Sequence, residues 1–217
     1  MSSRAQQGRP AKLSRAMICD AAEKLLESTD AASFSLRALG DQLGVDPTAV
    51  YRHFADKDDL LREVGDRTLR PVVHRFESSD DPQGDIERLC SRLRATLIRN
   101  PIGLTITASG PTRHENELRI TEIILNALSR AGLQDDDAVT AYHVLIEYTL
   151  GSAWLDAPLA APGADRAGTY RGWRADYALL DDHEYPTTKE LAKKLYPSSN
   201  KVFAAGLAAL ISGLVTN

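Results

Sequence analysis

The chain of 217 residues is poor in cysteine, in net charge and in long apolar runs. Its two cysteines, Cys19 and Cys90, are too few for a disulfide framework or a four-thiolate zinc site. Because both lie in apolar-periodic segments, we expect buried free thiols and a reducing compartment, the cytoplasm. No apolar run approaches the ~18 residues of a transmembrane helix, and the polar N-terminus does not read as a secretory signal. We therefore expect no membrane partner.

Sequence motifs of common catalytic sites are also missing. The chain has no glycine-rich phosphate loop, no nucleophile elbow and no HExxH zinc motif. The run Asp181-Asp182-His183-Glu184 contains several hard metal ligands, but neighbouring side chains point in different directions, so few of them can share one ion. We interpret this run as a solvated acidic loop. The missing motifs weaken the case for an enzyme without ending it. We expect no catalytic residue, no metal site, no cofactor and no enzymatic activity.

The net charge of −4 excludes a generally basic nucleic-acid coat protein but not a local basic patch. Residues 1–57 hold eight basic and seven acidic side chains, whereas residues 58–217 hold 18 and 23. The first 15 residues carry Arg4, Arg9, Lys12 and Arg15 and no acid. A basic arm of this kind is typical of segments that follow a nucleic-acid backbone, although a plain solubilising tail has the same composition.

Apolar residues recur with the period of an α-helix along nearly the whole chain, and no sustained alternating pattern predicts a strand. We expect an all-α fold of roughly nine or ten helices. One helix should begin at Asp56 and run past Leu69, with Pro71 kinking or interrupting it before it resumes to about Phe76. The helix over 112–131 should have one apolar side, made by Leu118, Thr121, Leu125 and Leu128.

Residues 35–54, SLRALGDQLGVDPTAVYRHF, contain two short helical patterns joined by a glycine-containing turn. This is the layout of a helix-turn-helix. Ser35 caps the first helix, and Gly44 suits the left-handed residue that ends it. Asp46-Pro47 begins the second helix, which we expect to reach about Phe54.

The same segment meets the packing needs of this motif in register. Gly40 is small enough to let the two helices cross, and Val50 is a β-branched residue that fills their junction. We expect Leu39, Leu43 and Val45 to complete the core. Because the turn, the caps and the core residues all agree, they predict the motif more specifically than a single glycine would.

The stretches GRPAKLSRAMICDAAEKLLE and SFSLRALGDQLGVDPTAVYRHFADKDDLLREV resemble the DNA-binding domain of TetR-type (tetracycline-repressor-like) transcriptional regulators over about residues 9–65. The resemblance implies a basic arm over 1–13 and a three-helix DNA-binding domain over 14–57. It also implies a larger helical domain over 58–217 that binds a small effector and forms the homodimer. No residue match points to a particular effector.

The second helix of the motif would enter the major groove of double-stranded DNA with its N-terminal part. Thr48 can donate its hydroxyl to a phosphate or touch a thymine methyl, and Ala49 is small enough to approach the groove floor. Arg52 can pair with guanine or hold a phosphate. Tyr51 and His53 can donate to phosphates, as the matching positions of the family do, although either could instead serve packing.

Three further cations are candidate contacts to DNA. Arg37 lies near the start of the first helix of the motif and can reach the neighbouring backbone or a base. Lys57 begins the next helix, where amides and an ammonium converge on one phosphate. Arg9, in the arm, can reach into a minor groove. Ordinary solvated surface charges are the alternative for Arg37, Arg52 and Lys57.

The helix over 135–157 is apolar nearly all round, which predicts burial on two sides. One side would face the core and an effector cavity, and the other a dimer partner. Its polar residues His143 and Glu147, with Thr107 and Trp154, are therefore effector-contact candidates. The spacing of His143 and Glu147 is also that of an ordinary helical side-chain pair.

The last helix, 201–215, carries small residues that permit close approach of a second helix, so it is a candidate for the dimer interface or an ordinary core helix. The function we expect is a dimeric, ligand-responsive regulator, a repressor released from a pseudo-palindromic operator by its effector. The alternative is a helical small-molecule enzyme or sensor whose N-terminal domain mediates protein contacts.

Overall fold

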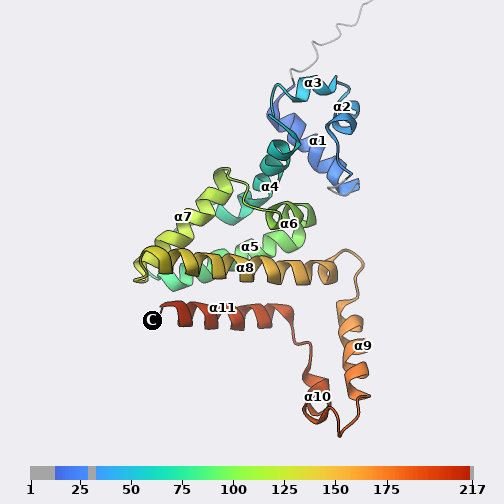
Figure 1. Ribbon diagram of the computed structural model, residues 1–217, viewed down its shortest axis with the longest axis vertical. Coiled ribbons are helices and arrows are strands. Elements are labelled where there is room, and N and C mark those ends of the chain that lie inside the picture. Colours follow the sequence, from blue (N-terminus) through green and yellow to red (C-terminus); the bar gives the residue numbers. More distant parts are fainter. Residues whose placement is uncertain (1–12, 29–32, 216–217) are drawn as a thin grey trace, which may run out of the picture. The chain divides into compact units, whose positions relative to one another are not determined.

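The structure is a computed structural model, and it describes residues 13–28 and 33–215 (Figure 1). Within these ranges every regular element is helical, which confirms the all-α fold. The chain divides into two compact units, Met1–Val64 and Gly65–Asn217. The functional boundary that we expect after residue 57 stays a prediction, because compactness does not assign a function to either side.

The first unit holds α1 (Arg15–Ser28), α2 (Leu36–Leu43), α3 (Pro47–Val50) and the start of α4 (Lys57–Val73). Its core contains apolar side chains from each of these helices. Those that are completely buried include Ile18, Ala22, Leu39, Val50 and Leu60. Cys19 is a buried thiol in this core, as expected from its place in an apolar pattern, and its Sγ donates to Glu63 Oε1 at 3.8 Å. The two helices of the predicted motif are α2 and α3.

Two expectations about helix ends in this part of the chain are wrong. Helix α3 ends at Val50, and residues 51–53 continue it as turns in which the His53 N–H donates to the Val50 carbonyl. Helix α4 is not interrupted at Pro71 and does not resume to Phe76 but ends at Val73. Pro71 lies in the last turn, where a missing amide donor removes only one helical hydrogen bond.

The second unit contains the remainder of α4 and the helices that follow it. These are α5 (Pro82–Arg99), α6 (Pro101–Ala108), α7 (Glu115–Arg130), α8 (Asp135–Ala160), α9 (Arg166–Ala178), α10 (Pro186–Leu191), a short 3-10 helix (Ala192–Lys194) and α11 (Ser199–Val215). The described residues thus form eleven α-helices, slightly more than the nine or ten expected. Pro158 also stays inside its helix, near the end of α8.

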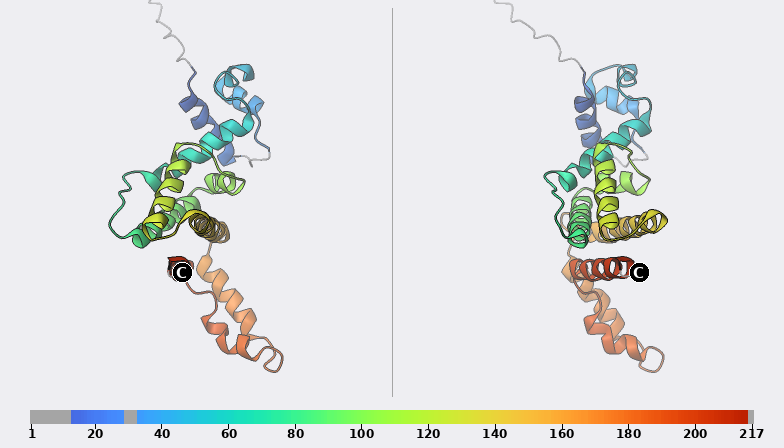
Figure 2. Two further views of the ribbon diagram at one scale, coloured as in Figure 1. Left: turned by 60° about the vertical axis from the view of Figure 1, so that its left-hand side comes forward. Right: turned by 90° about the vertical axis from the view of Figure 1, so that its left-hand side faces the viewer.

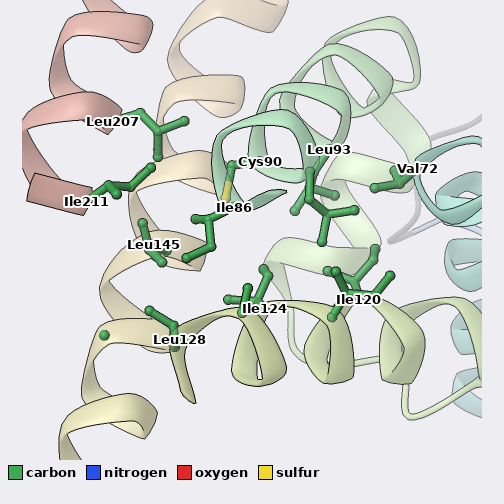
Figure 3. Packing of buried hydrophobic residues seen from close by; sticks show 14 of the residues in the cluster. Val72, Ile86, Cys90, Leu93, Ile120, Ile124, Leu128, Leu145, Leu207 and Ile211 are labelled. Carbon is green, nitrogen blue, oxygen red and sulfur yellow. The ribbon is translucent and has the colours of Figure 1, made fainter. Parts of the chain in front are cut away.

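The core of the second unit lies between α5, α7, α8 and α11 (Figure 3). Leu93 and Cys90 of α5, Ile124 of α7 and Leu145 of α8 are buried side by side there. Helices α8 and α11 run alongside one another in both views of Figure 2. Gly206 of α11 lies against Tyr148 of α8, and a Cβ at that position would meet the Tyr148 hydroxyl.

The expected apolar side of α7 is only partly right: Leu128 is buried, but Thr121 and Leu125 are half-buried. Leu118 is 55% exposed, and the buried residues of this helix are Ile120, Ile123, Ile124, Ala127 and Leu128. The helix also begins at Glu115, three residues later than expected. Isoleucines recur here at helical spacing beside the leucines, so the helix has two candidate faces. Packing against α5 and α8 selects the isoleucine face.

Candidate DNA-binding surface and effector cavity

The turn between α2 and α3 is fixed by local chemistry. The Ser35 hydroxyl accepts a hydrogen bond from the Ala38 N–H at 3.2 Å and caps α2. Gly44 ends α2 with φ of 65°, in the left-handed region that favours glycine. A Cβ at Gly40 would lie 3.0 Å from the Val45 carbonyl oxygen, so the crossing leaves little room for a side chain. These observations confirm the helix-turn-helix that the sequence predicts.

The candidate DNA contacts of this unit are mostly solvent-accessible. Arg37, Thr48, Tyr51 and Arg52 are exposed, and Ala49, His53 and Lys57 are half-buried. Tyr51 is 56% exposed, so it is not a core residue, whereas Phe54 is buried as expected. Arg9 lies outside the described residues. The Lys57 ammonium lies 5.6 Å from the centroid of the Phe34 ring, and its stem therefore runs along the core.

Thr48 does not offer its hydroxyl as a free donor in this structure. That hydroxyl donates to Asp46 Oδ1 at 2.7 Å, and the Thr48 N–H donates to the same oxygen at 2.8 Å. The two bonds, that of the hydroxyl first, lower the pKa of Asp46 and complete the cap of α3. The expected donation from Thr48 to a phosphate therefore requires a side-chain rotation, while its methyl group needs none to meet a thymine.

We call α3 and the turn residues 51–53 that follow it the recognition segment. Arg15 holds the end of this segment in place, a role that was not predicted from the sequence. Its guanidinium donates to the His53 carbonyl and to the Glu63 carboxylate, and it lies 4.1 Å from the Phe54 ring centroid. The bond to Glu63 raises the pKa of Arg15. The position of Arg15 in the sequence could have indicated this role. Arg15 begins α1 one turn before the buried Ile18, so it faces the core side of that helix.

A cavity of about 290 Å³ lies within the second unit. Apolar side chains from α4, α5, α7 and α8 form most of its wall, including Leu69, Leu93, Ile120 and Leu150. Five side chains bring polar atoms to it: Thr107, Thr112, Glu117, Tyr142 and His143. The structure thus brings together two of the four effector-contact candidates, Thr107 of α6 and His143 of α8.

Hydrogen bonds link Tyr142 to Glu117 at this cavity. The Thr121 hydroxyl donates to Glu117 Oε1 at 2.9 Å, and the Tyr142 hydroxyl lies 2.9 Å from the same Thr121 oxygen. Since Thr121 has one proton to give, Tyr142 is the donor in the second bond. Burial, with a smaller contribution from the Glu117 charge, raises the pKa of Tyr142. Tyr142 therefore stays a neutral phenol at physiological pH.

The other two effector-contact candidates lie elsewhere. Glu147 lines a separate cavity of about 570 Å³ between α8, α9 and α11, together with Tyr148, Tyr170 and Tyr196. Trp154 is 52% exposed on α8 and lines neither cavity. His143 and Glu147 are one helical turn apart, but the two cavities lie on different sides of α8. They do not share a site in this structure.

A buried carboxylate joins α4 to the beginning of α7. Asp66 is 4% exposed and accepts hydrogen bonds from the Thr112 hydroxyl, the Glu117 N–H, and both the backbone and side-chain amides of Asn116. Two of these partners, Thr112 and Glu117, also line the cavity. The sequence reading missed Asp66, although an acid between the buried Val64 and Leu69 of one helix was a usable signal.

The acidic loop near residue 181 has the solvated character that we expect. Residues 181–184 are exposed, and Asp181 Oδ1 accepts from the His183 N–H at 2.8 Å and the Glu184 N–H at 3.0 Å. The Glu184 and His183 amides lower the pKa of Asp181. Its carboxylate therefore caps its own turn. Across the described ranges, no cluster of His, Cys, Asp or Glu has a metal-binding arrangement.

None of the helices in the described part of the chain is by itself long and apolar enough to cross a membrane. The longest, α8, has 26 residues, but it begins with three aspartates.

Comparisons with known proteins agree with this architecture. An HTH-type transcriptional regulator of Saccharopolyspora erythraea is 29% identical over 174 residues, 80% of this chain and 72% of that protein. The HTH-type transcriptional repressor DrrR1 of Streptomyces coeruleorubidus is 23% identical over 205 residues, 91% of this chain and 75% of the repressor. ActR of Streptomyces coelicolor, solved in complex with actinorhodin, has the same fold with a TM-score of 0.81 at 22% identity, over 95% of this chain and 98% of that chain.

Two family models match most of the chain between them. The model described as bacterial regulatory proteins, tetR family, matches residues 18–64. The model described as tetracyclin repressor-like, C-terminal domain, matches residues 77–217. The first match contains the helix-turn-helix, and the second contains all the residues that line the cavity of Glu117 and Tyr142 except Leu69. The chain therefore belongs to the TetR family of transcriptional regulators.

Proposed function

We propose that this regulator is a repressor that binds operator DNA through α2 and α3 and leaves it when a small molecule enters the Glu117 cavity. The observation that carries the proposal is the set of exposed polar side chains on a helix-turn-helix whose Leu39 and Val50 are completely buried. These exposed side chains are Arg37, Thr48, Tyr51 and Arg52. Repressors among its relatives support this direction of control. Because it would bind operator DNA, the regulator would act in the cytoplasm.

The recognition segment would read bases from the major groove. In this proposal Arg52 pairs with a guanine edge, and the Thr48 methyl and Ala49 lie against thymine methyls. Tyr51 and His53 would donate to phosphates, and Arg15, which holds the His53 carbonyl, would fix their position. Arg37, Lys57 and, from the arm, Arg9 would bind the backbone and fix the register.

A homodimer would place two recognition segments in successive major grooves, about 34 Å apart, on a pseudo-palindromic operator. Helices α8 and α11 are the proposed interface. Leu155 is 78% exposed and Val202 52% exposed on these helices, and apolar side chains this exposed favour a partner. Ala204, Ala205 and Ala208 are also exposed on α11, where small side chains permit close approach of a second α11.

The proposed effector site is the cavity that Thr107 and His143 line. Helix α4 is continuous from the first unit into the second, so it is the proposed lever between effector and DNA. Effector and DNA would favour different states of the dimer, and each would weaken the binding of the other by the same factor. We propose no catalytic role for His143 and Glu147. They line different cavities and so would not act together on one substrate.

A salt titration tests the DNA-binding part of the proposal. Fluorescence anisotropy would follow binding of the full chain to a labelled duplex of random sequence between ~50 and ~200 mM salt. We expect affinity to fall by a factor on the order of 100, because bound phosphates release counterions. Indifference to duplex at the lower salt concentration would favour the alternative, in which the first unit binds protein.

A further inference from the structure

Glu117 is the one carboxylate in the described lining of the effector cavity, and no lysine or arginine lines it. The other polar groups are neutral hydroxyls and the His143 imidazole. None of the ion pairs among the described residues involves Glu117. The cavity thus holds a carboxylate whose charge is not balanced by a neighbouring cation.

The hydrogen bonds of Glu117 leave it able to accept more. Oε1 accepts from the Thr121 hydroxyl at 2.9 Å and Oε2 accepts from the Arg113 N–H at 3.2 Å. A carboxylate has about four acceptor positions, so each oxygen keeps one for a ligand. Because Thr121 and Arg113 hold the carboxylate in place, a ligand would not have to order it on binding.

The apolar wall of the cavity strengthens the effect of the Glu117 charge on a ligand. A carboxylate beside leucine and isoleucine side chains repels an anion and attracts a cation more strongly than it would in water. The Tyr142 ring lies edge-to-face against His143 with 5.2 Å between centroids, and aromatic faces also attract cations. The wall itself favours an apolar body. A preference for a cation and a preference for an apolar body together point to an apolar amine.

We propose that the effector is a compact, largely apolar molecule with a protonated amine, and that Glu117 binds this amine. The proposal rests on the proposed function, since it takes the cavity to be the effector site. A volume of about 290 Å³ is at the lower end of the ~300–1,000 Å³ that ligand pockets occupy. It suits two or three fused rings and is small for a coenzyme A thioester.

Three matched probes test the charge preference: anthracene-9-methylamine, anthracene-9-methanol and anthracene-9-carboxylic acid. Calorimetry on the full chain without DNA would give the Kd of each at neutral pH. We expect the amine to bind about tenfold more tightly than the alcohol, because a hydrogen bond to a charged group is stronger than a neutral one. We expect the carboxylic acid to bind most weakly.

Two variants assign the preference to one residue. Glu117→Gln keeps the size and removes the charge, and its amide oxygen can still accept from the Thr121 hydroxyl or the Arg113 N–H, though not from both. We expect it to bind amine and alcohol equally. Glu115→Gln removes the same charge from an exposed position in the same turn of α7, and we expect it to keep the preference for the amine. Circular dichroism would show that both variants are folded.

The proposal is overturned if the acid binds as tightly as the amine, if Glu117→Gln keeps the preference, or if none of the three probes binds the wild type. These outcomes are distinct from failure of the proposed function. Binding to duplex with a preference for the acid would refute only the amine. Binding of the amine by a protein that ignores duplex would refute the DNA-binding function and leave the ligand assignment standing.

Discussion

Asp85 is a completely buried carboxylate near the beginning of α5. It accepts hydrogen bonds from the Ser79 N–H at 3.0 Å, the Ser79 hydroxyl at 2.8 Å and Arg130 at 3.1 Å, and it also pairs with Arg88. Burial alone raises the pKa of Asp85, but the bonds from Ser79, Arg130 and Arg88 outweigh it, so the pKa lies below its usual value. The charged form is therefore the one that the fold stabilises.

A depressed pKa makes Asp85 a source of stability above the unfolded-state value of ~3.9, and that stability is lost as the pH falls through the folded-state pKa. We expect Asp85→Asn to lower the free energy of unfolding by roughly 3 kcal/mol at pH ~7. The difference from the wild type should shrink towards pH ~3. Urea unfolding at both pH values measures it. Asp80→Asn, which changes an exposed neighbour, is the control. The account would be contradicted if the free energies of unfolding of Asp85→Asn and the wild type differed by the same amount at both pH values.

The α2–α3 element contains two glycines that serve different needs. Gly44 has φ of 65° with open space around it, so Gly44→Ala should cost about 1 kcal/mol through backbone conformation alone. Gly40→Ala should cost more, since its Cβ would lie 3.0 Å from the Val45 carbonyl oxygen and 3.1 Å from Pro47 Cγ. We expect only Gly40→Ala to weaken DNA binding as well, because it displaces α3. Thermal unfolding and duplex anisotropy test this order; equal effects on both readouts would contradict it.

The Asp66 cluster joins α4 to the first turn of α7. In Asp66→Ala, the Thr112 hydroxyl and the Asn116 and Glu117 amides lose their acceptor, so we expect a loss of about 2–4 kcal/mol in stability. Hydrogen exchange at the Asn116 and Glu117 amides should become faster while the Leu128 amide keeps its protection. Unchanged exchange at the first turn of α7 would show that Asp66 does not hold it.

Elements with local signals were predictable from the sequence, and elements chosen by packing were not. Ser35, Gly44 and Asp46 act on residues within four positions of themselves, and the structure confirms their caps. The buried face of α7 depends on α5 and α8, so Leu118 was wrongly assigned to it. Asp66 bonds residues about 50 positions away, a separation that no periodicity encodes.

The candidate site divides in the same way. Thr107 and His143 were identified as polar residues among apolar ones, and they share the cavity. Glu147 follows the same rule but faces another cavity, because one turn of α8 is enough to change its surroundings. Glu117 was missed, since it is next to Leu118 on a helix whose apolar face was assigned only partly correctly.

For the whole molecule, the net charge of −4 is a poor guide to its partner. Residues 58–217 hold 18 basic and 23 acidic side chains, a surplus that keeps this part of the chain from binding phosphates unspecifically. The first 57 residues are nearly neutral, so Arg37, Arg52 and Lys57 do not have to overcome a local excess of acid.

Assembly is the property of the whole molecule on which operator binding depends. We expect Leu155→Arg to yield a monomer, because it places a charge on the proposed α8–α11 interface, and to weaken specific DNA binding at least tenfold. Leu179→Arg is the control, since Leu179 is 84% exposed at the end of α9, away from that face. Light scattering gives the mass of each variant; a dimeric Leu155→Arg would place the interface elsewhere.

Selection of bound sequences from a pool of random duplexes tests the central claim most directly. We predict that the wild type enriches an inverted repeat whose half-sites are centred about one helical turn or slightly more apart, as two recognition segments in successive major grooves require. Arg52→Ala should retain the fold and lose the enriched base at one position of each half-site. A wild-type protein that enriches no sequence, or only an unrepeated one, would contradict the account.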